Sequence, residues 1–197
     1  GILHLDTGDM YRAVGLAALD AKIDPKNQEA VCALCAQGGA QVDVRYHNGA
    51  QATLVNGQDV SERIRTQEAG MAASCVSRYL PVRQMLVRCQ RELSQSQPML
   101  LDGRDIGTVV LPDATVKIYL TASPEVRAQR RMLQLREKGD QTPFEQVLAE
   151  VNARDHQDMT RAVDPLRQAE DAICVDASAL NFEETVQAIL TLVEAHS

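Results

Sequence analysis

The stretch GILHLDTGDMYRAVGLAALDAK, residues 1–22, decides the fold, because it changes within a few residues from a strand pattern to a helix pattern. The first six residues are predicted to form a short buried strand, which ends at a turn and helix cap over 6–8. The next residues have helical periodicity, and Asp24-Pro25 ends the helix. A strand that runs directly into a helix is typical of an α/β protein.

The rest of the chain repeats this alternation, with one interruption. Further helices are predicted at about 27–37, 65–79, 81–95, 123–138, 143–161 and 181–196. Further buried strands are predicted at 98–102 and 115–120, and a last strand at 172–176. Strands separated by helices predict an α/β fold with a mainly parallel sheet flanked by helices. The interruption is 40–60, where apolar and polar residues alternate around Asn48-Gly49 and Asn56-Gly57, so we expect a small inserted antiparallel β unit there.

Composition restricts the class of protein. The 197 residues are 45% hydrophobic, which is enough for one core and a small subdomain. The net charge of −7 disfavours a nucleic-acid coat or a protein of the membrane surface, because either would carry a basic field. The five cysteines are odd in number and scattered, which indicates structural thiols in a reducing cytoplasm.

Two polar clusters follow predicted strands, where ligands bind in doubly wound sheets. In LDTGDMYR, residues 5–12, Thr7 and Arg12 could both face a phosphate, or Thr7 could cap the helix while Arg12 is solvated. In LDGRDIGT, residues 101–108, Arg104 could bind a phosphate in bidentate fashion and Asp105 could accept from a sugar or a base amine. An internally satisfied turn is the alternative for this second cluster.

Two further clusters lie on predicted helices. Arg154, Asp158 and Arg161 share one helix face, where they could bind a phosphate and a ribose. From the residues alone, a surface ion-pair ladder is the favoured interpretation of that face. The helix after Ser123 is strongly basic, and it is either a solvated face or a lid that closes over phosphates.

Taken together, these segments resemble the bacterial cytidylate kinases, a family of nucleoside monophosphate kinases. The matching strings are LDTGDMYR, IRTQEAGMAAS with PVR, LDGRDIGTVVLPDATVKIYLTAS, RRMLQLREKG and the ARD…TRAVDPL run. They occur in the family's order and spacing over nearly the whole chain.

The resemblance implies a role for each matching position. The CMP phosphate would be held by Thr7, Arg12, Arg104 and Arg161. The base pocket would contain Asp105 near the cytosine amine, with Ser74 and Arg83, and Arg154 and Asp158 would face the ribose. The lid, about 125–142, would carry Arg127, Arg130 and Arg131. The residues expected to act in catalysis are Arg104, Arg161, Arg127 and Arg131.

The resemblance also implies the reaction and the domain plan. The reaction is transfer of the ATP γ-phosphate to CMP or dCMP in the cytoplasm, with Mg²⁺ accompanying ATP, by a protein that we expect to be a monomer without a nucleic-acid or membrane partner. The core would be 1–37 and 76–197, and 38–75 would be the inserted subdomain that binds the monophosphate.

One family feature has no match in residues 1–197. The family has a strand and a Gly-rich phosphate loop that ends in Gly-Lys-Ser/Thr, and no such string is present here. We therefore expect a truncated form whose first strand and phosphate loop are absent, which would leave a gap in the parallel sheet. The 1–197 polypeptide is then predicted to have little or no kinase activity. The alternatives are a CMP-binding remnant without activity and a kinase for another nucleoside monophosphate.

Overall fold

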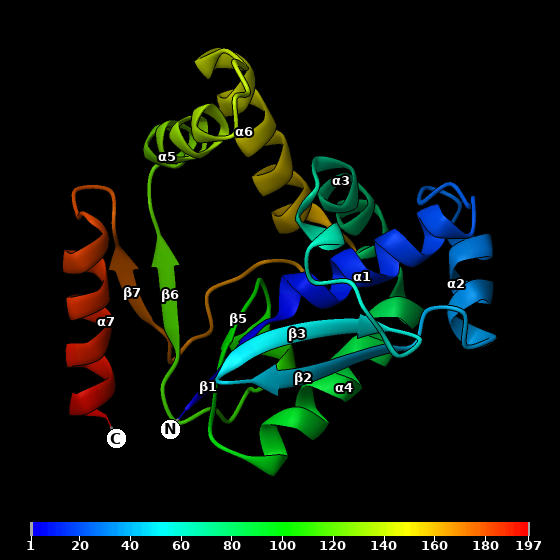
Figure 1. The fold of residues 1–197 in the computed structure, drawn as a ribbon. Coiled ribbons are helices and arrows are strands. Elements are labelled where there is room, and N and C mark those ends of the chain that lie inside the picture. The colour runs from blue at the N-terminus through cyan, green and yellow to red at the C-terminus, as the bar shows by residue number, and fades with distance from the viewer. Residues whose placement is uncertain (1, 197) are drawn as a thin grey trace. The chain divides into compact units, whose positions relative to one another are not determined.

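The computed structural model describes residues 2–196, which form two compact units, Gly1–Ile106 and Gly107–Ser197 (Figure 1). Each unit contains one pair of parallel strands and the helices that pack near it. The α/β prediction is therefore confirmed. The parallel pairing is divided into two sheets, one in each unit.

The first unit begins with the predicted strand, turn and helix. Strand β1, Leu3–Asp6, pairs in parallel with β5, Met99–Asp102, so that Asp6 lies opposite Asp102 at their carboxyl ends. Helix α1, Thr7–Asp20, follows at once, and the Asp6 side chain caps it by accepting from the backbone N–H of Asp9. The register thus brings two segments far apart in the sequence to one sheet edge.

Three further helices surround α1: α2, Gln28–Ala36; α3, Gln67–Val76; and α4, Leu80–Ser96. Their N-caps include Asn27 and Thr66, and Pro81 lies in the first turn of α4, as Pro commonly does. Gly15 lets α1 and α3 approach closely, because a Cβ at Gly15 would lie 2.8 Å from the Ala72 Cβ. The main core cluster of the unit is largely aliphatic, with these fully buried members: Leu5, Met10, Val14, Ala18, Val31, Ala40, Val76 and Val82.

The segment after α2 is the predicted antiparallel unit. Strands β2, Val42–His47, and β3, Ala50–Val55, form a hairpin, and the short β4, Gln58–Asp59, pairs with β3. Both Asn-Gly turns have positive φ angles at each residue, which is the conformation that Asn-Gly favours in two-residue hairpin turns. The 3₁₀ helix η1, Arg63–Arg65, then leads into α3.

The second unit contains β6, Ile118–Thr121, which pairs in parallel with β7, Ile173–Asp176. Helices α5, Pro124–Glu137, and α6, Phe144–Thr160, pack side by side through Ala128, Met132 and Val147 (Figure 1). Ser123 caps α5, as predicted. The last helix is α7, Phe182–Ala195, with a capping box at its start. A short π-helical segment, Ile106–Val110, spans the boundary between the two units.

The prediction of buried strands is wrong for β5 and β6. Leu100 of β5 is 47% exposed and Leu120 of β6 is 52% exposed. Each described parallel sheet has two strands, and the sides that carry Leu100 and Leu120 are left largely open to solvent, whereas Leu5 of β1 is fully buried. Helix α7 shows the same lack of cover, because none of its residues, all of which are described, is buried.

Within residues 2–196, no helix is both long enough and apolar enough to cross a membrane.

Candidate functional site

The start of α1 holds the first predicted phosphate-binding residue, Thr7. Its side chain is buried, and its hydroxyl donates a 2.6 Å hydrogen bond to the carbonyl oxygen of Asp102. This approach requires the glycine at 103, because a Cβ there would lie 2.4 Å from the Thr7 oxygen. The cap is Asp6 rather than Thr7, so the hydroxyl of Thr7 joins the carboxyl ends of β1 and β5 and keeps its lone pairs for a further donor.

Arg12 lies one turn further along α1 and is held by the backbone. Its Nη1 donates to the carbonyl oxygen of Ile64 at 3.3 Å. Gly70 of α3 leaves room for the guanidinium, since a Cβ at Gly70 would lie 2.9 Å from Nη1. A carbonyl partner fixes the guanidinium without cancelling its charge, which suits it to an anion.

The structure joins Arg83 and Asp105, two residues predicted for the base pocket. Arg83 is 1% exposed, and its Nη2 donates to the Asp105 carboxylate in a buried ion pair. Its Nη1 donates to the carbonyl oxygen of Ser77 at 3.1 Å, and its Cζ lies 5.6 Å from the centre of the Tyr11 ring. These three partners come from α1, from the end of α3 and from the segment after β5, so the guanidinium has one position.

Ser74 and Arg104 are the remaining site residues of the first unit. Ser74 is partly buried on α3, two turns after the Thr66 cap. Arg104 is exposed in the segment that follows β5, directly before the buried Asp105. The unit therefore carries the predicted residues on α1, α3, α4 and the segment after β5, and Thr7 directly contacts the carboxyl end of β5.

In the second unit, the predicted residues gather at the end of α6. Asp158 and Arg161 are both buried, at 6% and 9% exposure, whereas Arg154 is exposed. Arg161 donates from Nε and Nη2 to the carbonyl oxygen of Asp164, at 2.7 and 2.5 Å. The surface-ladder interpretation of this helix face therefore does not describe Asp158 and Arg161, because an exposed ladder would leave both in solvent.

The basic helix α5 is tied to its own unit. Arg127 forms a bidentate pair with Asp155 of α6, at 2.9 and 2.5 Å, and also donates to the carbonyl oxygen of Ala122. Arg130 donates to the carbonyl oxygens of Ala177 and Leu180. The third predicted lid residue, Arg131, is exposed. Two of the three lid arginines thus have structural partners in this conformation.

Sequence reasoning missed several side chains that support these residues. Tyr11 faces Arg83, and Asp155 pairs with Arg127, although neither was assigned a role from the sequence. A third case is Arg65 of η1, whose Nη2 lies 2.5 Å from Asp9 and whose Nη1 lies 3.7 Å from Asp6. Tyr11 and Asp9 lie inside the string LDTGDMYR, close to Arg12. The one sequence signal for a role of either residue was therefore its position on the predicted helix relative to Arg12.

Carboxylates crowd the carboxyl ends of β1 and β5. Burial, and after it the charge of Asp6, raise the pKa of Asp9 to about 6, although Arg65 and Arg12 act in the opposite direction. Burial also raises the pKa of Asp102, although the ring of His4, 2.5 Å from its carboxylate, acts in the opposite direction. This edge therefore combines guanidinium groups with carboxylates that gain protons more readily than usual.

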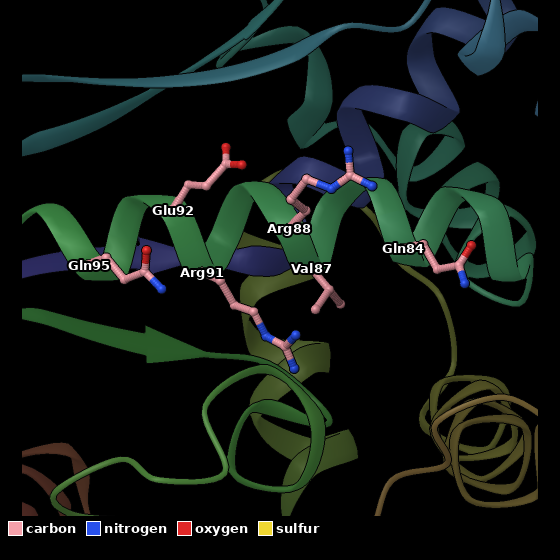
Figure 2. Close-up of a pocket in the computed structure, with 6 residues that line it drawn as sticks. All are labelled: Gln84, Val87, Arg88, Arg91, Glu92 and Gln95. Carbon is pink, nitrogen blue, oxygen red and sulfur yellow. The ribbon is translucent and has the colours of Figure 1, made fainter.

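Among the described residues, neither a metal site nor a surface hollow adds to this site. Residues 2–196 contain no group of three or more His, Cys, Asp or Glu side chains that could hold a metal ion. A hollow lies along α4, lined by Gln84, Val87, Arg88, Arg91, Glu92 and Gln95 (Figure 2). None of the predicted site residues lines it, and the guanidinium groups of Arg88 and Arg91 point in different directions.

The comparisons with known proteins agree with the motifs. The family model described as "Cytidylate kinase" matches residues 1–195. A curated cytidylate kinase of Caldicellulosiruptor bescii is 44% identical over 98% of this chain and 84% of its own length. The cytidylate kinase of Shouchella clausii is 44% identical over 100% of this chain and 87% of its own. The cytidylate kinase of Enterobacter sp. is 46% identical over 94% of this chain and 81% of its own length.

Proposed function

We propose that this chain, which belongs to the cytidylate kinase family, transfers the γ-phosphate of ATP to CMP or dCMP. The observation that carries the proposal is the buried pair of Arg83 and Asp105. A fixed donor beside a fixed acceptor suits a base that has both a carbonyl and an exocyclic amine, as cytosine has. A base with the wrong pattern would find no matching partners for its own polar groups beside this pair, which is a source of discrimination.

At the phosphate end, we assign Thr7, Arg12 and Arg104 of the first unit to the acceptor phosphate, together with Arg161 of the second unit. Arg154 and Asp158 are assigned to the ribose. Convergence of these groups on one CMP stays a prediction. Phosphoryl transfer needs positioning and charge neutralisation more than covalent chemistry, and hydrogen-bonded guanidinium groups supply both.

We assign the segment of about 125–142 to a lid whose Arg127, Arg130 and Arg131 approach the phosphates. For Arg127 and Arg130 to bind the phosphates on closure, they would exchange the Asp155 pair and the carbonyl contacts for phosphate contacts. We also assign 38–75, which includes the antiparallel strands, to a subdomain that binds the monophosphate, and 1–37 with 76–197 to the core.

Mg²⁺ accompanies ATP in kinases, where substrate phosphates supply much of its coordination. The side chains of residues 2–196 offer it no cluster of three ligands, so we assign no residue to it and derive no step through it. The five free cysteines, in line with a reducing compartment, support our assignment to the cytoplasm. A monomer is part of the same proposal.

A second candidate function follows from the sequence. Residues 1–197 contain no Gly-rich loop that ends in Gly-Lys-Ser/Thr, so apart from the lid arginines the residues assigned above account for the acceptor and not for the ATP phosphates. The second candidate is therefore CMP binding by this polypeptide without measurable transfer.

Titration calorimetry with CMP, UMP, AMP and an ATP analogue tests both candidates. We expect the 1–197 polypeptide to bind CMP more tightly than UMP or AMP, and Arg161→Ala to weaken CMP binding at least ten-fold, the scale of one lost charge-assisted hydrogen bond. Arg63→Ala, a change at an exposed ion pair, is the control. Equal binding of all three monophosphates would refute the base assignment. CMP turnover, measured with ATP, separates the two candidates.

A further inference from the structure

Asp9 is buried at the start of α1, and the contacts of the folded chain do not explain why a carboxylate lies there. The residue is 2% exposed, and its Oδ2 accepts from Arg65 Nη2 at 2.5 Å. Its other oxygen, Oδ1, is also buried and has no hydrogen-bond partner among the described residues. A buried carboxylate oxygen without a donor is costly, and such groups in native proteins usually have a functional reason.

The neighbouring ion pair of Arg63 and Asp20 shows what a structural contact looks like here. It lies on the same 3₁₀ helix, two residues before Arg65, and it is bidentate at 3.0 and 2.6 Å. Both of its side chains are at least half exposed, so the pair is an ordinary surface ion pair of small energy. The Arg65–Asp9 pair differs, because the carboxylate is buried while 54% of the Arg65 side chain remains open to solvent.

Arg65 is also close to the residues assigned to the phosphate. Arg12 donates to the carbonyl oxygen of Ile64, the residue before Arg65. Asp6 contacts Arg65 at 3.7 Å and is followed in the chain by Thr7. All of these residues belong to the first unit. An exposed guanidinium is thus anchored beside the start of α1, a helix end that attracts anions.

We propose that Arg65 is a further residue that binds the acceptor's phosphate, and that Asp9 is its positioning residue, which takes up a proton when the phosphate binds. The inference rests on the proposed function, because it adds a residue to the same acceptor site. In the free protein, Asp9 holds Arg65 in place. When the phosphate arrives, Arg65 turns its charge to the phosphate oxygens, and Asp9 Oδ1 takes a proton from solvent.

The charges around Asp9 support this coupling. The charged groups that face it are Asp6 of β1, Arg12 of α1 and Arg65 of η1. Burial and Asp6 raise the pKa of Asp9 to about 6, against the two arginines. A phosphate adds negative charge nearby and draws Arg65 away from the carboxylate, and both changes raise this pKa further. At pH 7, Asp9 is therefore mostly ionised in the free protein and gains a proton on binding.

Calorimetry of CMP binding to the 1–197 polypeptide at pH 7, in two buffers of different ionisation enthalpy, measures the protons taken up. We expect a net uptake of several tenths of a proton with CMP and much less with cytidine, which lacks the phosphate. Asp9→Asn should remove the Asp9 share of this uptake. Arg65→Gln should weaken CMP binding by about ten-fold to a hundred-fold, as expected for a lost charge-assisted pair, and Arg65→Lys should restore part of it.

Arg63→Gln is the matched control, because it removes a guanidinium two residues away, and CMP binding should then change less than two-fold. Unchanged CMP affinity in Arg65→Gln, or equal proton uptake in Asp9→Asn and the parent, overturns this inference and leaves the proposed function intact. If the parent polypeptide binds no CMP, the proposed function itself is refuted, and this inference with it. Arg65 is exposed, so its variants are expected to fold, and circular dichroism checks this.

Discussion

Replacing Asp9 by asparagine should change how the stability of the protein depends on pH, and the structure fixes the sign. The pKa of Asp9 in the folded protein is about 6, against an ordinary value of 3.8. Between these two values the native state binds more protons than the unfolded state. The free energy of unfolding of the parent protein therefore falls as the pH rises through this window. Above the window, the full cost of keeping Asp9 ionised in the folded state lowers the stability.

The size of the effect follows from the shift. About 2 pKa units correspond to about 3 kcal/mol as an upper bound, because each unit is worth about 1.4 kcal/mol. The asparagine side chain in Asp9→Asn does not titrate, so the variant is free of this penalty. Its free energy of unfolding, relative to the parent, should rise by up to about 3 kcal/mol between about pH 4 and pH 7. Any constant cost of the substitution cancels when only the change with pH is considered.

Urea denaturation of both proteins, followed by far-ultraviolet circular dichroism at intervals between pH 4 and pH 8, measures this difference. Asp20→Asn provides the control, because Asp20 is the exposed partner of Arg63 and its replacement should change stability by less than about 1 kcal/mol. A difference between the Asp9→Asn variant and the parent that is flat over this range, or that falls with pH, contradicts the argument from burial.

Two further substitutions test the packing of the first unit. Asp105→Ala leaves the Arg83 guanidinium buried without its carboxylate partner. Urea denaturation should then give a free energy of unfolding that is lower by about 3–5 kcal/mol, and a loss below about 1 kcal/mol would show that the pair is solvated. Gly15→Ala places a Cβ 2.8 Å from the Ala72 Cβ and 2.9 Å from the backbone nitrogen of Ala73, so the two helices must separate. We expect a loss of about 1–3 kcal/mol in thermal melting, with Gly38→Ala, where the Cβ meets nothing within 4 Å but φ is positive, as a comparison for backbone strain alone.

Local chemistry explains which parts of the fold could be predicted from the sequence. The Asn-Gly turns, the Ser123 cap and the Pro81 helix start depend on a few adjacent residues, and each formed where expected. The cover of the strands could not be predicted in this way. Leu100 and Leu120 are apolar and lie in strands, yet both are about half exposed, because burial depends on which other elements pack against a sheet.

The site residues divide along the same line. Motifs predicted a role for Arg83 and Asp105, but their ion pair joins positions 22 residues apart, and no periodicity indicates it. The pair of Arg127 and Asp155 was missed for the same reason, since its members lie on two helices. A sequence pattern shows which chemical groups are present near a strand end or on a helix face. Which of them neutralise one another is decided by packing.

That distinction bears on how a chain with a net charge of −7 would bind an anion, as we propose. A guanidinium paired with a carboxylate, such as that of Arg63, has no net charge to offer, whereas Arg12 is held by a backbone carbonyl and keeps its charge. Arg65 belongs to a third kind, because its carboxylate partner is poised to be protonated. In our proposal, its charge is cancelled while the site is empty and restored when a phosphate binds, so the acidic protein need not carry an uncompensated positive cluster in its resting state.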